Sequence, residues 1–198
     1  MKKGLIAIIV IVIIALIGYF WVKSSYNGMV AQEESVSSQW AQVQNAYQRR
    51  ADLIPNLVAT VKGYASHEQQ TLEAVVEARA KATQMQVNAD QLTEENIQKY
   101  QEAQGQLGAA LGRLMMITEN YPDLKANTNF LQLQDELAGT ENRISTERNK
   151  FNEKVKGYNI SIRTFPKNIL AGIFGFDKKA YFEADRTAQS APNVDFSK

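Results

Sequence analysis

The chain contains no cysteine, one histidine and four prolines among its 198 residues. Without cysteine it can form no disulfide, thiolate nucleophile or cysteine-based metal site. The single histidine, His67, lies in "HEQQT", where Thr71 replaces the second histidine of the H-E-x-x-H zinc-protease motif. One imidazole with scattered carboxylates makes a poor zinc site, and no G-x-S-x-G elbow is present to support a serine triad. We therefore expect no enzymatic activity, cofactor or bound metal.

An excess of charge of either sign is also missing. The chain carries 22 basic and 21 acidic residues, a formal net charge of +1. This balance lacks the basic footprint of a nucleic-acid-binding protein, so no nucleic-acid partner is expected. Two pairs of adjacent carboxylates, Glu33–Glu34 and Glu94–Glu95, are predicted to be solvated helix positions, because neighbouring residues of a helix face different ways.

One long apolar run opens the chain, with no charge between Lys3 and Lys23. The residues 4–22 would span roughly 28 Å as a helix, close to the hydrocarbon thickness of a bilayer. A cleavable signal peptide is the alternative, but its apolar core is usually shorter, about 7–15 residues. The run therefore predicts an uncleaved transmembrane anchor, with aromatic residues at one interface. Representative positions of this span are Gly4, Leu5, Ile14, Tyr19, Trp21 and Val22.

The basic residues around this run predict its orientation. Lys2 and Lys3 precede the span, whereas only Lys23 follows it before Arg49. Positive-inside reasoning then places the N-terminus in the cytoplasm and the following domain outside the plasma (inner) membrane, as a single-pass protein.

Beyond the anchor, apolar residues recur at helical spacing and strand signals are missing. The pattern predicts an all-α fold, in which the transmembrane helix continues into an antiparallel bundle of about four long helices. The first helix should extend to about residue 62, and the others should cover about 67–89, 93–120 and 128–164. Ser66 with Gln69 resembles a capping box and Thr93 a further cap; whether 63–66 forms a turn or a bend stays open. The expected division is an anchor at 1–23, a bundle at 24–164, and a segment at 165–198 that packs on the bundle or the membrane.

Three glycines occur at i, i+3 and i+7 in the third predicted helix: Gly105, Gly108 and Gly112. A phosphate-binding loop would need a preceding strand and a following Lys-Ser/Thr pair, and both are missing. The glycines are therefore predicted to let a neighbouring helix approach closely.

The stretch "RRADLIPNLV" at 49–58 interrupts the first helix of the bundle. Pro55 lacks an N–H and its ring clashes with the carbonyl of residue 51, so the helix either kinks or breaks, with Asp52 capping the amide of Ile54. Arg50 falls on the apolar stripe and should pair with a carboxylate of a facing helix. Either arginine could also donate to the freed carbonyls. A structural kink is favoured over a docking surface, which would consist of Arg49, Arg50, Asp52, Pro55 and Asn56.

A second apolar segment, "RTFPKNILAGIFGFDKKAYF", follows at 163–182. In an up-and-down bundle the fourth helix returns to the bilayer, so this segment could enter the interface while Lys167, Lys178 and Lys179 meet lipid headgroups. Packing over the bundle end, or a subunit contact, is the favoured alternative. The residues concerned are Phe165, Pro166, Ile169, Leu170, Ile173, Phe174 and Phe176.

Several strings in the chain are similar to those of the LemA family of bacterial membrane-anchored proteins. They are "SSQWAQVQNAYQRRADLIPNLVATVKGYASHE", "LEAVVEARAKA", "FNEKVKGYNISIRTFPKNILAGIFGF" and "YFEADRTAQSAPNVDF". The resemblance implies an N-terminal anchor and a helical bundle, and it implies no defined reaction. Related proteins are often encoded beside HtpX-type membrane metalloproteases or TPM-domain proteins, which implies an accessory or scaffold role.

Together these observations predict a membrane-anchored scaffold or adaptor of the bacterial cell envelope without catalytic activity. Its expected partners are the lipid bilayer, further copies of the chain, and a membrane protease or TPM-domain protein. An extracytoplasmic ligand-binding or sensing module is one alternative, which a polar pocket between helices would favour. An accessory subunit of a membrane metalloprotease is another.

Overall fold

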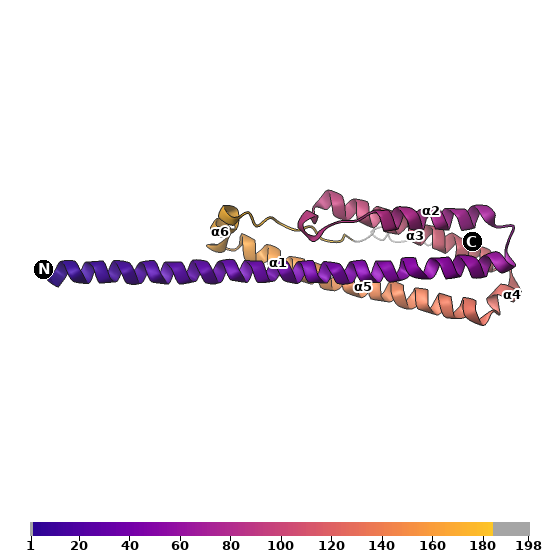
Figure 1. The fold of residues 1–198 in the computed structure, drawn as a ribbon, viewed down its shortest axis with the longest axis horizontal. Helices are drawn as coiled ribbons and strands as arrows, with labels where there is room; N and C mark the ends of the chain where they lie inside the picture. The colour runs from indigo at the N-terminus through magenta and orange to yellow at the C-terminus, as the bar shows by residue number, and fades with distance from the viewer. Residues whose placement is uncertain (1, 184–198) are drawn as a thin grey trace, which may run out of the picture.

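The computed structural model describes residues 2–183, and within them it contains helices and no strand (Figure 1). The predicted all-α fold with about four long helices is confirmed. The long helices are α1 (Lys2–Tyr64), α2 (Gln69–Gln84), α3 (Glu94–Thr118) and α5 (Thr128–Arg163). Three short elements complete the order: η1 (Ala89–Gln91), α4 (Pro122–Lys125) and α6 (Lys167–Phe174).

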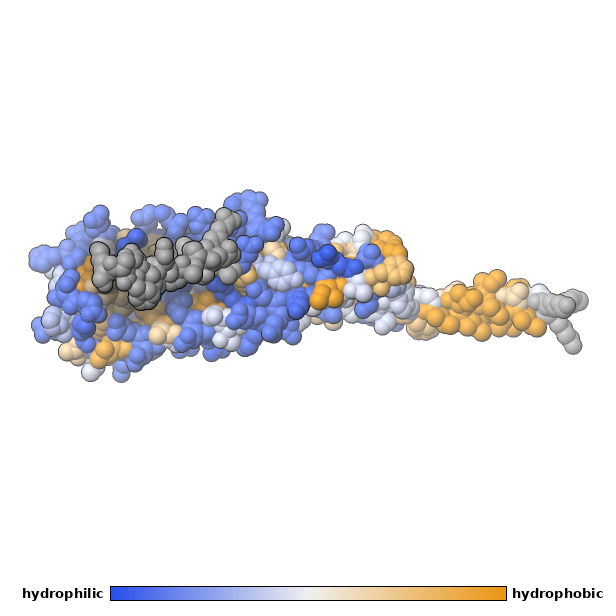
Figure 2. Space-filling model, turned by 180° about the vertical axis from the view of Figure 1, so that it is seen from behind, coloured by the Kyte–Doolittle hydropathy of each residue, from blue (hydrophilic) through white to orange (hydrophobic). Residues whose placement is uncertain are grey.

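Helix α1 is 63 residues long, which corresponds to roughly 95 Å, and it belongs both to the apolar run and to the bundle. Its first part projects alone from the hydrophilic body of the molecule (Figure 2). The side chains of Leu5, Ile14, Tyr19 and Trp21 are exposed there, and Val22 is the first residue that is half-buried. The length and composition of this part fit a membrane-spanning helix.

The other long helices pack along the remainder of α1. Helix α5 runs antiparallel to α1 and packs against it over most of the bundle, while α2 and α3 form an antiparallel hairpin of which α2 lies closer to α1 (Figure 1). Helices α3 and α5 therefore face each other without packing closely.

The core of the bundle consists of two apolar clusters placed end to end along α1. The cluster nearer the projecting end contains Trp40, Tyr100 and Phe151 among its largest members. The far cluster contains Ile54, Leu107 and Phe130. The periodic apolar stripe of each helix supplies both clusters, as expected for amphipathic helices.

The helix ends show which local signals were read correctly. Thr93 caps α3 by accepting a hydrogen bond from the amide of Asn96 at 3.3 Å, as predicted. The capping box was wrong, because α2 begins after Glu68 and has no side-chain cap. Helix α2 also ends at Gln84, earlier than predicted, and the chain turns sharply between α1 and α2 around residues 65–68.

Candidate functional site

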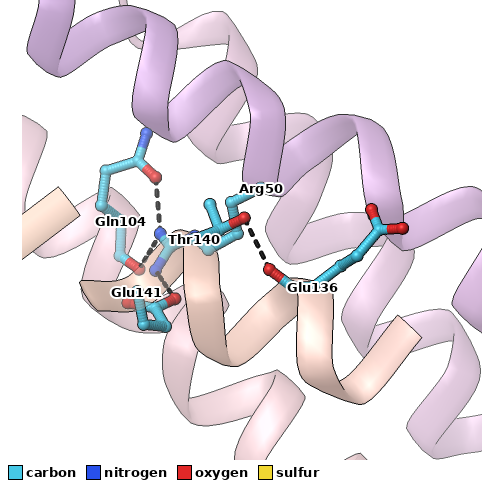
Figure 3. Close-up of polar contacts among 5 residues, drawn as sticks. All are labelled: Arg50, Gln104, Glu136, Thr140 and Glu141. Atoms are coloured by element: carbon cyan, nitrogen blue, oxygen red, sulfur yellow. Dashed lines mark hydrogen bonds and ion pairs between the residues drawn. The ribbon is translucent and has the colours of Figure 1, made fainter. Parts of the chain in front are cut away.

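A layer of polar side chains separates the two apolar clusters, with Arg50 of α1 at its centre (Figure 3). Arg50 is only 4% exposed. One of its terminal nitrogens, Nη1, donates to Oε1 of Glu141 on α5 at 2.7 Å. The other, Nη2, donates to the side-chain Oε1 of Gln104 on α3 at 2.7 Å and to the Gln104 carbonyl at 3.0 Å. The predicted pairing of Arg50 with a carboxylate of a facing helix is thus present.

The layer also reaches the fourth long helix. Gln104 uses its Nε2 to donate to the carbonyl of Ala82 on α2 at 3.2 Å. Thr140, in the same layer of α5, donates its hydroxyl to the Glu136 carbonyl at 2.8 Å, one turn earlier (Figure 3). A single arginine and its glutamine partner therefore connect α1, α2, α3 and α5, which fixes their relative register because a buried charge is tolerated only where its partners are in place.

The Arg50 guanidinium is held between an aromatic ring and the groove described below. Its Cζ lies 5.1 Å from the ring centroid of Tyr47, close enough for a cation–π contact. Its Nε is buried and has no hydrogen-bond partner among the residues that the structure describes. Burial raises the pKa of the Tyr47 hydroxyl, and the positive charges of Arg148 and Arg50 oppose that shift.

Pro55 leaves α1 unbroken, and the carbonyl that it deprives of a partner is satisfied from another helix. In a helix the carbonyl of Ala51 would accept from the amide of residue 55, which proline lacks. Instead, Nε of Arg79 on α2 donates to the Ala51 carbonyl at 2.7 Å. The expectation that Arg49 or Arg50 fills this role was wrong, because both side chains are directed elsewhere while α2 crosses beside the carbonyl.

The five residues proposed as a docking surface lie on two sides of α1. Arg50 points into the bundle, whereas Arg49, Asp52, Pro55 and Asn56 are exposed. Asp52 does not cap a new helix, since its Oδ1 accepts from Gln48 one turn earlier at 2.7 Å. An Asp52 cap was wrong because Ile54, its proposed partner, lies inside a continuous helix.

An open groove of about 900 Å³ runs between α3 and α5, beside the polar layer. Arg50, Gln104 and Glu141 line it at the polar layer, and Gln101 and Arg148 line it further toward the projecting end. A smaller apolar groove continues from it past Leu111, Met115 and Leu137.

Gly105 and Gly108 of α3 line the large groove, and Gly112 lines the smaller one. Among residues 2–183, a Cβ atom placed on Gly105, Gly108 or Gly112 would meet no neighbouring atom within 4 Å. The prediction that they allow a close helix approach was therefore wrong. The groove exists because α3 packs more closely on α2 than on α5, which leaves the glycine face uncovered among the described residues.

The chain that follows α6 extends along the bundle to the start of this groove. Asn159 exchanges two hydrogen bonds with the backbone of Lys179, at 2.8 and 3.0 Å. Asn152, two turns earlier on α5, holds the backbone of Phe182 in the same way, at 2.9 and 2.8 Å. The Glu183 carbonyl then accepts from Gln101 of α3 at 3.0 Å. The sequence analysis missed this arrangement, although two asparagines seven residues apart on one helix face were its available signal.

The apolar cluster nearer the projecting end of α1, called the membrane-proximal cluster below, is built around Trp40. Its indole Nε1 donates to the Val87 carbonyl at 2.8 Å, and its ring packs against those of Tyr100, Phe151 and Phe182. Burial raises the pKa of Tyr100 well above its usual value, and the nearby Tyr47 raises it further.

At the edge of the same cluster, Glu147 of α5 forms a further polar contact with α1. Its carboxylate accepts from Gln39 at 2.7 Å and from Lys150 at 3.1 Å. These two hydrogen bonds hold the pKa of Glu147 below its usual value, and the bond from the Gln39 amide has the larger effect.

The residues of the second apolar segment divide between a buried and an exposed face. Leu170 is buried against the membrane-proximal cluster and Phe176 is half-buried there. The exposed residues are Phe165, Pro166, Ile169, Ile173 and Phe174. Lys179 is buried and pairs with Glu33 of α1 at 2.8 Å, so its expected contact with lipid headgroups was wrong.

Within residues 2–183, no three histidine, aspartate or glutamate side chains come together in a group that could hold a metal ion. His67 is exposed in the turn between α1 and α2. The paired Glu94 and Glu95 are exposed in the first turn of α3, as the sequence predicts.

Known proteins resemble this chain in sequence. It is 37% identical to the magnetosome protein MamQ 2 of Paramagnetospirillum magneticum and 36% identical to MamQ of Magnetospirillum gryphiswaldense, each over 92 residues. These matches cover 46% of this chain and 34% of each MamQ protein, so the chain spans about a third of their length. It is 25% identical to protein LemA of Metamycoplasma hominis over 166 residues, which cover 84% of this chain and 72% of that protein.

The names of these relatives denote no chemical reaction. A sequence model of the LemA family matches residues 39–196, which include α2 to α6 and the part of α1 that carries the polar layer. The chain therefore belongs to the LemA family.

Proposed function

We propose that this protein is a membrane-anchored scaffold or adaptor of the bacterial cell envelope with no catalytic activity of its own. The observation that carries the proposal is α1, one uninterrupted helix from the projecting apolar run to the far end of the bundle. Because α5 and α2 pack on α1, its direction fixes the direction of the whole bundle relative to the bilayer. A rigid body of this kind presents long helical surfaces at a set orientation.

The finer assignment of this proposal follows from charge. Lys2 and Lys3 precede the span and one lysine follows it, which favours a cytoplasmic N-terminus and an extracytoplasmic bundle in the plasma (inner) membrane. The absence of native cysteine makes the orientation directly measurable. A cysteine at Met116, on the exposed surface of α3, should react with an impermeant maleimide in intact spheroplasts, whereas labelling only after lysis would reverse the orientation.

Self-association is the property that tests the proposed scaffold function. Full-length protein extracted in mild detergent should have a discrete native mass of several chains. Single cysteines on exposed helix faces, such as that of Arg49, Asp52 and Asn56, would then locate the contact by disulfide cross-linking. A strictly monomeric protein would exclude self-organisation and leave the adaptor role, whose partner would be a membrane protease or a TPM-domain protein.

A second candidate function is an extracytoplasmic ligand-binding or sensing module, and the groove between α3 and α5 favours it. It combines two arginines, Arg50 and Arg148, with amide and carboxylate groups, as a polar ligand would require. Gly108 lines this groove and Gly139 of α5 does not, while both have room for a side chain. If the groove binds a ligand, the Gly108→Leu gene should fail to complement a strain from which the wild-type gene has been deleted. The matched Gly139→Leu gene should complement it as the wild type does. Equal rescue by both variants would reject the groove as a binding site.

A further inference from the structure

Helix α6, together with Phe165 just before it, presents an apolar face that nothing in the described part of the chain covers. The exposed fractions are 77% for Phe165, 54% for Ile169, 70% for Ile173 and 48% for Phe174. Leu170 and Ala171, on the opposite face, are buried against the membrane-proximal cluster. A short helix with one face packed and one large apolar face in solvent is unusual for a soluble surface, and such a patch marks a contact site.

The position of α6 identifies what covers this face. The ring of Phe174 packs edge-on against Tyr26 of α1 at 4.9 Å between centroids, and Phe176 contacts the same ring at 5.6 Å. Val22, the last residue of the apolar run, packs against the same cluster as Leu170. Val22 and Tyr26 are one helical turn apart, about 6 Å, so α6 lies level with the point where α1 leaves the bilayer.

The views of the whole molecule agree with this placement. Helix α6 lies at the end of the bundle beside the projecting part of α1 (Figure 1). The apolar colour of the projecting helix is followed by an apolar patch at that same end of the body (Figure 2). The exposed face of α6 is thus adjacent to the lipid-facing surface of the span.

Contacts on both sides of the following loop hold α6 at this level. Lys179 pairs with Glu33 of α1, and the hydroxyl of Tyr158 on α5 donates to the Asp177 carbonyl at 3.0 Å. Lys178 remains exposed next to α6, where a bilayer surface would place headgroup phosphates. The depth of α6 relative to α1 is therefore fixed by the fold.

We propose that α6 and the preceding Phe165 form a second membrane contact, in which the Phe165, Ile169, Ile173 and Phe174 side chains insert at the boundary between headgroups and acyl chains. The occupant of this face is the lipid bilayer that α1 spans. Two points of contact, the span and α6, would prevent the bundle from tilting or rotating freely about the exit point of α1. The inference rests on the proposed anchoring of α1 in a membrane.

The experiment uses the full chain, which has no native cysteine, in vesicles of phosphatidylcholine and phosphatidylglycerol. Single cysteines replace Ile173 on α6, Ile14 in the span and Met116 on α3, and each carries an environment-sensitive fluorophore. Ile173 and Met116 are matched in exposure, at 70% and 66%. The Ile173 label should be blue-shifted, quenched by lipids with a nitroxide on the acyl chain, and several-fold less quenched by aqueous iodide than the Met116 label.

Each other outcome rejects the proposal in a distinct way. If the Ile14 label is quenched by nitroxide lipids and the Ile173 label is as open to iodide as the Met116 label, the anchor stands and α6 does not touch lipid. If the Ile173 label is shielded from both quenchers and the shielding weakens when the protein is diluted in lipid, a second copy covers α6. If neither the Ile14 nor the Ile173 label is quenched by lipid, the anchor itself fails.

Discussion

Replacing Arg50 by alanine should destabilise the bundle more than any single exposed substitution in it. The change leaves the buried side-chain oxygen of Gln104 without a donor and removes the second donor to the Gln104 carbonyl, which keeps its bond within α3. An unsatisfied buried acceptor costs about 1–3 kcal/mol. Glu141 adds little, because its side chain is 50% exposed and recovers water when Arg50 is lost. The expected loss is about 3 kcal/mol of unfolding free energy, between the values for a surface and a fully buried pair.

Thermal unfolding of the full chain in mild detergent, followed by far-ultraviolet circular dichroism, measures this loss. For a chain of this size 1 kcal/mol corresponds to about 2–4 °C, so Arg50→Ala should lower Tm by roughly 6–12 °C. Glu141→Gln keeps an acceptor for the guanidinium and should lower Tm by no more than about 2–4 °C, the equivalent of one modest hydrogen bond.

A double substitution separates the polar contacts from simple packing. Arg50→Met with Gln104→Leu removes the donor and its principal acceptor together, so much of the loss seen with Arg50→Met alone should be recovered. A Tm for the double variant as low as the sum of the two single effects would refute the reasoning. So would an Arg50→Ala variant that melts within about 2 °C of the wild type, since that shift is under 1 kcal/mol.

Three further predictions concern other contacts. Pro55→Ala supplies the missing amide, so it should stabilise α1 by up to about 3 kcal/mol, and the destabilisation caused by Arg79→Ala should fall by at least half in that background; an unchanged cost would show that Arg79 acts elsewhere. Gly105→Ala and Gly112→Ala should each raise Tm by an amount equivalent to about 0.5–1 kcal/mol, because their Cβ atoms enter open space, and a lowered Tm would show that the groove is filled. The pKa of Glu147 is lower when folded than when unfolded, so its contribution is present above about pH 4.3 and is lost as the pH falls through the folded pKa; the Tm difference between wild type and Glu147→Gln should shrink as the pH is lowered below about 4.3, and a difference independent of pH would contradict this.

The features that the sequence predicts well depend on contacts close along the chain. The apolar run, the helical periodicity and the Thr93 cap each follow from residues within one or two turns. The pairing of Arg50 also follows, because a charge on an apolar stripe needs a partner whichever helix provides it. The identity of that partner did not follow, since Gln104 and Glu141 lie 54 and 91 residues away in the chain.

The errors arise where another helix decides a local question. Pro55 was expected to kink or break the helix, with Arg49 or Arg50 available for the freed carbonyl, yet Arg79 of α2 donates to that carbonyl and α1 continues unbroken. The glycines of α3 were expected at a close crossing, but the close neighbour of α3 is α2, and the glycines line the grooves on the side of α5. In both cases the local property of the residue was predicted correctly, but the helix that lies beside it was not. Sequence spacing alone does not say which helices pack together.

The length of α1 limits what kind of partner could use the groove. Arg50 follows Val22 by 28 residues, so the polar layer stands roughly 40 Å beyond the end of the span. An extended chain covers at most about 3.5 Å per residue, and a loop rising from the bilayer would need about 12 residues to reach that height and as many to return. If α6 also rests on the membrane, the bundle cannot tilt to bring the groove closer. A partner bound there would therefore be a free ligand or the folded domain of another protein, whereas a partner restricted to the membrane plane would contact the lower part of α1 or α6.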